Sequence, residues 1–262
     1  MTNEKILYRV DEGIAWITLC EPPANTYSYA MMRELDAAVL EARMDKTAHA
    51  IVLRGDGEKF FCAGADIKML TEADPGFKYF FCLHANETLN RLEQTPKVVI
   101  AALNGHCVGG GLEIALAADL RVAKKGGGKI GLPEVSLGVL PGTGGTQRLA
   151  RALGRARAFE LMATGRTFSF DEAKELGLVH EVFEAATFDA HVREYASRFL
   201  PPSAASKAVG LIKRAVVSGL EAGFNEGLAL ERELQQRLFE SDDAKEGLAA
   251  YVERRAPQFT GR

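Results

Sequence analysis

The sequence contains little of what metal centres and disulfide frameworks require. Only 4 of its 262 residues are cysteine, and 5 are histidine. The cysteines are widely spaced with no C-x-x-C pair, and no two histidines stand at the H-x3-H or H-E-x-x-H spacing of zinc sites. This pattern predicts a reduced cytoplasmic protein with free thiols, and it gives no support for a bound metal.

Charge of one sign and long apolar runs are also missing. The formal net charge is −3 and the isoelectric point is about 6.0, and the basic pairs at 124–125 and 254–255 are too short for a nucleic-acid surface. Residues 1–13 lack the basic flank and apolar stretch of an export leader. The longest apolar run, VVIAAL at 98–103, is the length of a strand, so neither nucleic acid nor a membrane is an expected partner.

Glycine is plentiful, yet the standard nucleotide-binding loops are absent. The pattern GxxxxGK[ST] does not occur, and the segment from Gly105 to Gly111 lacks the GxGxxG spacing. The cluster PGTGGTQRL at 141–149 opens a predicted helix without a strong strand before it. Any one such cluster alone is more typical of a tight turn than of a ligand site.

What the sequence does contain is a regular alternation of strand and helix patterns. The composition, 47% hydrophobic and 26% charged, is that of a globular protein. The expected elements are a hairpin from ILYRV and IAWITL, a helix over 29–44, a strand at HAIVLRG, a helix over 76–93, a strand at KVVIAALNG, a helix to about residue 118 and a strand at LRVA.

This alternation predicts an α/β fold with crossover connections over residues 1–200. After about Phe188 the strand signals end, and three amphipathic helices are expected at roughly 204–218, 221–239 and 242–255. We interpret residues 201–262 as a helical region for packing or oligomerisation.

Two loops of small residues stand out as candidates for chemistry. Ala63-Gly64-Ala65 and Gly109-Gly110-Gly111 have no bulky side chains to keep a ligand from their backbone N–H groups. The second loop opens a helix, where N–H groups lack partners within the helix and carry the positive end of its dipole. Two bare amides from separate loops are what an oxyanion hole needs.

Two glutamates accompany these loops. Glu113 lies in the first turn of the glycine-led helix, and Glu134 lies in GLPEVSLGVLPG. Taken singly, Glu113 is explained as an acid complementing the helix dipole, and Glu134 as an acid near the N-terminus of a short helical turn. Together with two amide loops they could hold a water and exchange its protons, with burial raising a carboxyl pKa toward the working range.

Other nucleophiles have less support. Cys62 and Cys107 adjoin the two loops, but no general base is evident for either, and buried cysteine is usually inert. There is no G-x-S-x-G motif. His106 is more simply a structural residue, and Asp66 is more simply a helix cap.

Four motifs in order resemble the crotonase family, the enoyl-CoA hydratases and isomerases. They are AGADIKML at 63–70, NGHCVGGGLEIALAADLRVA at 104–123, LPEVSLGVLPGTGGTQRLAR at 132–151 and DDAKEGLAAYVERRAPQF at 242–259. The resemblance covers essentially the whole chain. It implies a spiral of ββα repeats followed by a C-terminal helical trimerisation region.

The resemblance also implies roles for individual residues. The amides of Ala65 and Gly110 would bind the thioester oxygen, Glu113 would orient and help deprotonate a water, and Glu134 would deliver a proton to Cα. Further substrate contacts implied by the resemblance are to coenzyme A, at Ala63, Gly64, Asp66, Ile67, Lys68 and Arg254. Arg254 would approach the 3′-phosphate, often from a neighbouring subunit.

The implied activity is hydration of 2-enoyl-CoA thioesters in fatty acid metabolism, because both glutamate positions are occupied. The implied assembly is a homo-oligomer, a trimer or a dimer of trimers, and no separate cofactor is expected, since coenzyme A is part of the substrate. An isomerase using Glu134 alone and a non-catalytic, RNA-binding relative remain as alternatives. The Lys-Gly-rich segment 124–134 departs from the family pattern and is expected to form a surface loop, and EPPANTYS leaves the acyl group open.

Overall fold

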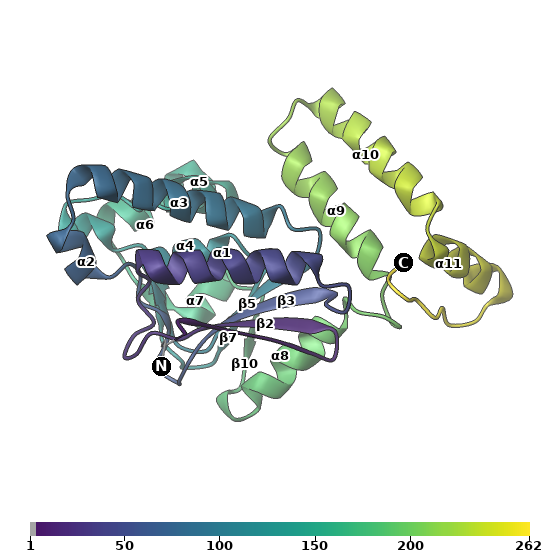
Figure 1. Cartoon of the computed structure of the whole chain (residues 1–262), viewed down its shortest axis with the longest axis horizontal. Coiled ribbons are helices and arrows are strands. Elements are labelled where there is room, and N and C mark those ends of the chain that lie inside the picture. The colour runs from purple at the N-terminus through teal and green to yellow at the C-terminus, as the bar shows by residue number, and fades with distance from the viewer. Residues whose placement is uncertain (1–3) are drawn as a thin grey trace.

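The core of the protein is a six-stranded mixed sheet. The computed structural model describes residues 4–262 (Figure 1). The sheet order is β1-β2-β3-β5-β7-β10, and only the β1–β2 pair is antiparallel. The bounds are β1 Ile6–Asp11, β2 Ile14–Leu19, β3 Ala50–Gly55, β5 Val98–Leu103, β7 Leu120–Lys124 and β10 Glu181–Phe183.

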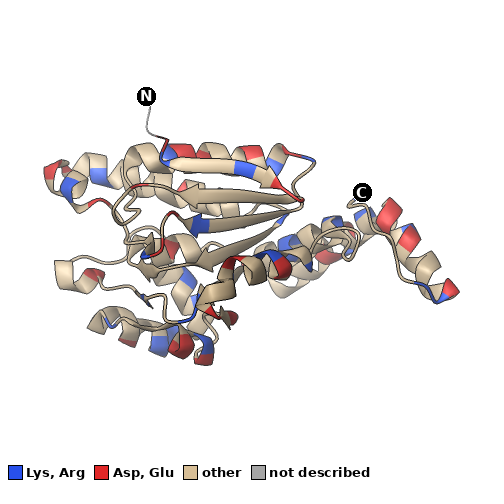
Figure 2. Ribbon diagram, turned by 90° about the horizontal axis from the view of Figure 1, so that it is seen from below, with Lys and Arg blue, Asp and Glu red and all other residues tan. Residues whose placement is uncertain are grey.

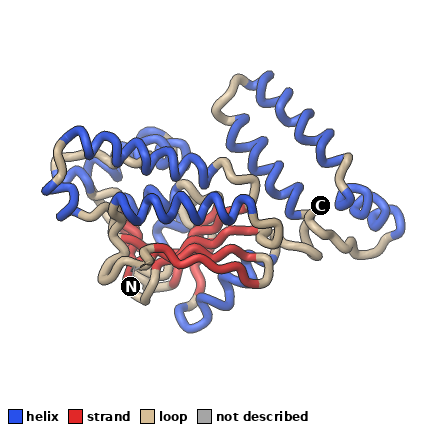
Figure 3. The backbone as a smooth tube through the Cα atoms, in the orientation of Figure 1, coloured by secondary structure: helices blue, strands red, loops and turns tan. Residues whose placement is uncertain are grey.

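These strands form because their residues are apolar and often β-branched. Every residue of β5 is buried, as expected for a parallel strand with covered faces. Across the sheet one register row joins Ile17, Leu53 and Ala101. Figure 3 shows the strands gathered between the helices that cover them. The strands expected from the sequence are confirmed, whereas the short β10 was not predicted.

Helices cover the faces of this sheet. In Figure 1, α1 and α3 lie along one face and α8 lies on the other side. The expected helix over 29–44 is confirmed, and Ser28 caps it by accepting from the N–H of Met31. The helical elements before the tail are α1 Tyr29–Met44, α2 Ile67–Glu72, α3 Pro75–Glu93, α4 Gly110–Leu116, η1 Glu134–Leu137, α5 Gly145–Leu153, α6 Arg155–Thr164, α7 Phe170–Glu175, η2 Ala185–Thr187 and α8 Phe188–Ser197.

A second, four-stranded sheet carries the small-residue loops. Its order is β4-β6-β8-β9, with bounds β4 Phe60–Cys62, β6 His106–Val108, β8 Lys129–Gly131 and β9 Phe168–Ser169. The first three strands are mutually parallel. Their carboxyl ends therefore meet at one edge, and the loops that follow β4 and β6 lie side by side there.

Two expectations are corrected in this part of the chain. The Lys-Gly-rich segment forms a turn only over 125–128, because Lys124 ends β7 and 129–131 form β8. Strand β8 pairs with β6 and leads directly to η1, so the segment belongs to the second sheet. The helix α8 was also not predicted, since the sequence indicated only three helices after residue 188.

The C-terminal region consists of three helices that project from the core (Figure 1). Their bounds are α9 Ser206–Gly219, α10 Phe224–Phe239 and α11 Asp242–Glu253, which match the expected three helices to within a few residues. Figure 2 shows acidic and basic residues interspersed along these helices. In α9, Lys213 forms an ion pair with Asp119 of the core at 2.9 Å, and both side chains are largely buried.

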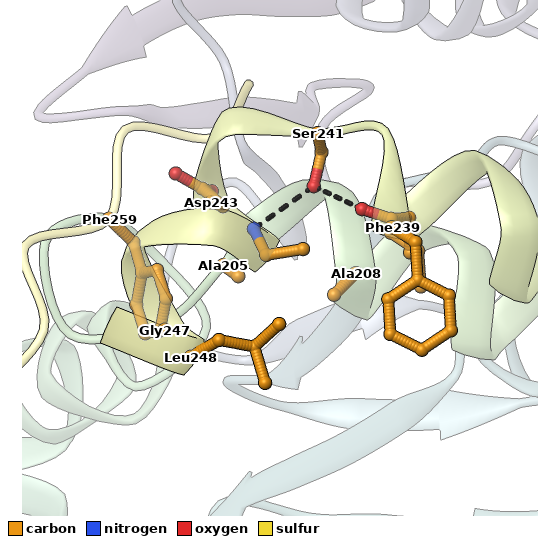
Figure 4. Close-up of a pocket in the computed structure, with 10 residues that line it drawn as sticks. Ala205, Ala208, Phe239, Ser241, Asp243, Gly247, Leu248 and Phe259 are labelled. Carbon is orange, nitrogen blue, oxygen red and sulfur yellow. Dashed lines mark hydrogen bonds between the residues drawn. The ribbon is translucent and has the colours of Figure 1, made fainter. Parts of the chain in front are cut away.

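An apolar pocket of about 300 Å³ lies within this helical region (Figure 4). Its lining comes from α9, the end of α10, α11 and the final segment, including Ala208, Leu248 and Phe259. At its rim the Ser241 hydroxyl accepts from Ala244 N–H at 3.1 Å and donates to the Leu238 carbonyl at 2.6 Å. None of the predicted site residues lines this pocket.

The structure has no helix, among the residues it describes, with the length and hydropathy needed to cross a bilayer. The expectation that residues 1–13 form no export leader concerns, in part, residues 1–3, which lie outside the described part of the chain.

Candidate active site

Backbone hydrogen bonds hold the loop after β4 and leave one of its N–H groups without an acceptor. The N–H of Ala63 donates to Ala24, the N–H of Tyr27 donates to Gly64 and the N–H of Asp66 donates to Tyr27, all at 2.9–3.0 Å. Among residues 4–262, no acceptor is found for the N–H of Ala65. This amide is therefore available to a ligand.

The loop after β6 presents a second amide of this kind. Gly109 has φ of 57°, a left-handed conformation that favours glycine, and its N–H donates to Gly131 of β8 at 2.9 Å. Gly110 then begins α4, and its N–H has no acceptor within the described chain. A side chain at Gly110 would overlap the phenol oxygen of Tyr27, so only glycine fits.

The two amides face one region of space. A Cβ atom added to Gly64, whose φ is 94°, would lie 3.1 Å from the Gly110 nitrogen. The carbonyl carbon of Gly64 is bonded to the Ala65 nitrogen, so the two free N–H groups lie within roughly two hydrogen-bond lengths of each other. This spacing is short enough for one oxygen atom to accept from both, which an oxyanion hole requires.

Glu113 is held rigidly beside this region. Its side chain is buried, with the residue 2% exposed. One carboxylate oxygen accepts from the N–H groups of Thr143 at 2.8 Å and Gly145 at 2.7 Å, and the other accepts from the Thr143 hydroxyl. Burial raises the pKa of Glu113, and these hydrogen bonds oppose that rise.

Glu134 approaches the same region from η1, of which it is the first residue. Its Oε1 atom lies 3.2 Å from where a Cβ on Gly109 would stand. Its Oε2 atom is buried, and no hydrogen-bond partner is found for it in the described structure. Burial raises the pKa of Glu134 to about 7, with the charge of Glu113 adding to the rise. A carboxyl group with this pKa can both give and take a proton near neutral pH.

Three residues of the site were not predicted individually. Thr143, Gly145 and Tyr27 surround Glu113, and the Tyr27 hydroxyl lies 3.3 Å from that of Thr143. Thr143 and Gly145 lie in the cluster PGTGGTQRL, and its small residues, which let the backbone approach Glu113, could have indicated their place. A Cβ on Gly145 would lie only 3.0 Å from Glu113 Oε1. Nothing in the sequence near Tyr27 pointed to its place here.

The other residues predicted to contact coenzyme A fall into two groups, one beside the Ala65 amide and one in the projecting C-terminal region. Asp66 caps α2 by accepting from the N–H groups of Lys68 and Met69, and Ile67 and Lys68 are exposed on that short helix. The structure therefore keeps them near the Ala65 amide. Arg254 ends α11 in a left-handed conformation, φ 55°, and Figure 1 shows α11 in the projecting region, away from α4.

The side chains that the sequence disfavoured as nucleophiles, Cys62, Cys107 and His106, are buried or make structural hydrogen bonds. Burial raises the pKa of the Cys62 thiol to about 12 and raises that of Cys107 well above its usual value. Such thiols stay protonated and are poor nucleophiles. His106 accepts from the N–H of Lys129 at 3.1 Å and so joins β6 to β8. Across residues 4–262, no three His, Cys, Asp or Glu side chains are grouped to hold a metal.

Comparisons with known proteins identify the family of this chain. The family model for enoyl-CoA hydratase/isomerase matches residues 9–262. A probable enoyl-CoA hydratase from Mycobacterium bovis is 40% identical, with 100% of both chains covered, and a short-chain-enoyl-CoA hydratase from Clostridium acetobutylicum is 36% identical, with 97% of both covered. A crystal structure of an enoyl-CoA hydratase from Geobacillus kaustophilus is 46% identical with a TM-score of 0.96, and the match covers 100% of this chain and 98% of that one.

The solved relatives share the crotonase fold that the four motifs implied, so the predicted fold is confirmed. Because the family model covers residues 9–262 and relatives about 40% identical match its whole length, the chain belongs to the enoyl-CoA hydratase/isomerase family.

Proposed function

We propose that this protein hydrates 2-enoyl-CoA thioesters to 3-hydroxyacyl-CoA by means of Glu113, Glu134 and the amides of Ala65 and Gly110. The observation that carries the proposal is that two N–H groups without acceptors lie close to each other and to two carboxyl groups, Glu113 buried and Glu134 partly buried. Neither an isolated oxyanion hole nor an isolated acid pair would support addition of water to a conjugated thioester.

The two amides would bind the thioester oxygen. As water adds to Cβ, electron density moves onto that oxygen and an enolate develops. Preorganised N–H groups in a largely buried site stabilise this charge without reorganising, and loss of one such donor typically lowers the rate about a hundred- to a thousandfold.

The two glutamates would divide the proton transfers. Ionised Glu113 takes a proton from water while the water oxygen bonds to Cβ. Protonated Glu134 gives its proton to Cα as the enolate collapses, so one proton enters the pair and one leaves it. The raised pKa of Glu134 supports its assignment as the acid, because this carboxyl holds its proton to about pH 7.

Double-bond isomerisation is the second candidate, because Glu134 alone could move a proton between carbon atoms. The buried Oε2 without a partner favours such a shuttle. The comparison of Glu113→Gln with Glu134→Gln separates the two functions. We expect Glu113→Gln to abolish the loss of crotonyl-CoA absorbance while sparing conversion of a 3-enoyl-CoA, and Glu134→Gln to abolish both.

The experiment needs a control for substitution itself. Glu231→Gln, at an exposed position of α10, should leave both activities unchanged. Unchanged crotonyl-CoA absorbance with the wild-type protein, alongside turnover of a 3-enoyl-CoA, would assign the isomerase instead. No turnover on any enoyl-CoA, together with salt-dependent RNA retention, would point to the non-catalytic alternative.

We further propose that the helical region at 201–262 joins copies of the chain into a trimer or hexamer in the cytoplasm. The support is a set of large apolar side chains on it that are strongly exposed in a single chain, Leu220, Phe224, Tyr251 and Val252. In such an assembly Arg254 could reach coenzyme A bound to a neighbour, and no other cofactor is required. Light scattering after size exclusion tests the assembly: a monomer at working concentration contradicts it.

A further inference from the structure

The two oxygens of Glu113 are held in different ways. Oε1 accepts the backbone N–H groups of Thr143 and Gly145, and a substitution at 143 other than proline leaves both N–H groups in the chain. Oε2 accepts from a single side chain, the Thr143 hydroxyl. Behind that hydroxyl lies the phenol of Tyr27, with an oxygen–oxygen separation of 3.3 Å. Both Thr143 and Tyr27 are 3% exposed, so water cannot readily substitute for either.

The chemistry of these groups fixes the direction of the hydrogen bonds. An ionised carboxylate only accepts, and a threonine hydroxyl has one proton to donate. The Thr143 proton must therefore point at Glu113, and the Thr143 oxygen must accept from Tyr27. Tyr27 can donate because burial, followed by the charge of Glu113, raises its pKa well above the ordinary value and keeps the phenol protonated.

We infer that Thr143 is a positioning residue, whose hydroxyl, backed by Tyr27, keeps the second oxygen of Glu113 an acceptor and fixes the carboxylate for its water. This inference rests on the proposed function. Three hydrogen bonds occupy both lone pairs of Oε1 and one of Oε2, so a proton taken from water is left only the remaining lone pair of Oε2. The Thr143 hydroxyl donates more strongly to the ionised carboxylate than to the protonated carboxyl group. The network therefore fits Glu113 as a base and disfavours its protonated form.

Other charged and titratable groups lie near Glu113, but none of those in the described structure gives it a second side-chain hydrogen bond. Arg148 of α5 favours the ionised form through its charge, whereas Glu134 of η1 and Glu113 repel each other when both are ionised. Cys82 of α3 is held neutral by burial, with the charge of Glu113 raising its pKa further. The thiols of β4 and β6, Cys62 and Cys107, are neutral as described above. Only Thr143 donates a side-chain hydrogen bond to Glu113 in the described structure.

The test is the pH profile of kcat/KM for crotonyl-CoA hydration in Thr143→Val. Loss of one hydrogen bond to a charged group should move the acidic limb upward by about one pH unit, which is roughly a tenfold loss on that limb with little change at the optimum. Thr143→Ser, which restores the hydroxyl, should return the limb to its place. Thr146→Val makes the same change three residues away, where the hydroxyl contacts Gln147, and should not move the limb.

A uniform loss at every pH, or an unmoved limb, would overturn the inference, because a merely structural role does not displace a titration. If Thr143→Val does not fold by circular dichroism, Thr143→Ala supplies the same measurement with a smaller side chain. Failure of the proposed function gives a different result: the wild-type protein would then leave the crotonyl-CoA absorbance unchanged, whereas failure of the inference alone leaves wild-type hydration intact and the acidic limb of Thr143→Val unmoved.

Discussion

Glu113 and Glu134 are the same residue type in the same site, but their surroundings differ. Glu113 lies on the helix α4 and accepts three hydrogen bonds, whereas Glu134 begins the short turn η1 and has a buried oxygen without a partner in the described structure. Burial raises the pKa of both, but only for Glu113 do donors from neighbouring residues oppose the rise. The difference teaches that placement of donors, more than residue type, separates a base from an acid.

The largest effect on kcat is expected from displacing the Gly110 amide, on which the proposed roles of both glutamates depend. In Gly110→Ala the new methyl group would overlap Tyr27 and displace the amide that binds the thioester oxygen. We expect kcat to fall about a hundred- to a thousandfold, measured by steady-state hydration. Gly219→Ala is the matched control, because its Cβ would meet only ordinary contact at 3.8 Å. Near-normal kcat in Gly110→Ala would mean that the glutamates act without this donor.

The second-largest effect is expected in the pH dependence of kcat/KM, which distinguishes the titration of Glu134 from that of Glu113. Hydration and dehydration both require a single proton on the pair, so both directions should give the same bell-shaped profile. The alkaline limb should lie near pH 7, where Glu134 loses its proton, and the rate should fall about tenfold per unit above it. An alkaline limb well away from pH 7 in the wild-type protein would assign the titration to another group.

A smaller effect should follow from loosening the loop that holds Glu113. Arg148 donates to Glu93 and Asn90 of α3 and contacts the carbonyl of Thr143 at 3.4 Å. We expect Arg148→Met to reduce kcat roughly tenfold, since misplacement of a catalytic group is costly, and to leave KM nearly unchanged. Arg151→Met is the control on the same helix, because Arg151 pairs with Glu221 at an exposed position. Equal losses in both variants would contradict a specific role for the loop.

The smallest effect concerns stability. The pKa of Glu134 is raised from 4.5 to about 7 in the folded protein, so the native state binds more protons than the unfolded state over that interval. The wild-type protein therefore loses stability as pH rises through it, and Glu134→Gln should be more stable by about 1 kcal/mol at pH 8, after allowance for partial exposure. The gain should vanish below pH 4.5.

Denaturant titration at both pH values measures this gain. Glu113→Gln should gain less, because an amide nitrogen in place of either oxygen cannot accept the hydrogen bonds that the carboxylate receives. Equal gains in the two variants would remove the distinction between the surroundings of the carboxyl groups.

Much of this site was predictable because its chemistry depends on short segments. The small residues at 63–65 and 109–111 and the nearby glutamates carry their meaning in local sequence, and the parallel strands before them bring the two loops together. The helix over 29–44 was equally readable, since its apolar residues recur at helical spacing and Ser28 caps it.

What could not be predicted depends on contacts between distant segments. Tyr27 and Thr143 are separated by 116 positions, and neither has a local pattern that reveals their meeting. The strands β8, β9 and β10 have only two or three residues, too few for a hydrophobic period to emerge. For Arg254 the proposed contact lies on another copy of the chain, so its role stays a prediction.

The ion pair between Lys213 and Asp119 bears on how the molecule can be divided. Asp119 lies just after the helix α4, and its partner comes from α9, beyond the boundary that the sequence predicts at residue 200. Cutting the chain there would remove the lysine and leave a carboxylate in a low-dielectric setting next to the machinery. A fragment suited to engineering or directed evolution should therefore extend at least through α9, because Lys213 neutralises a buried carboxylate of the core.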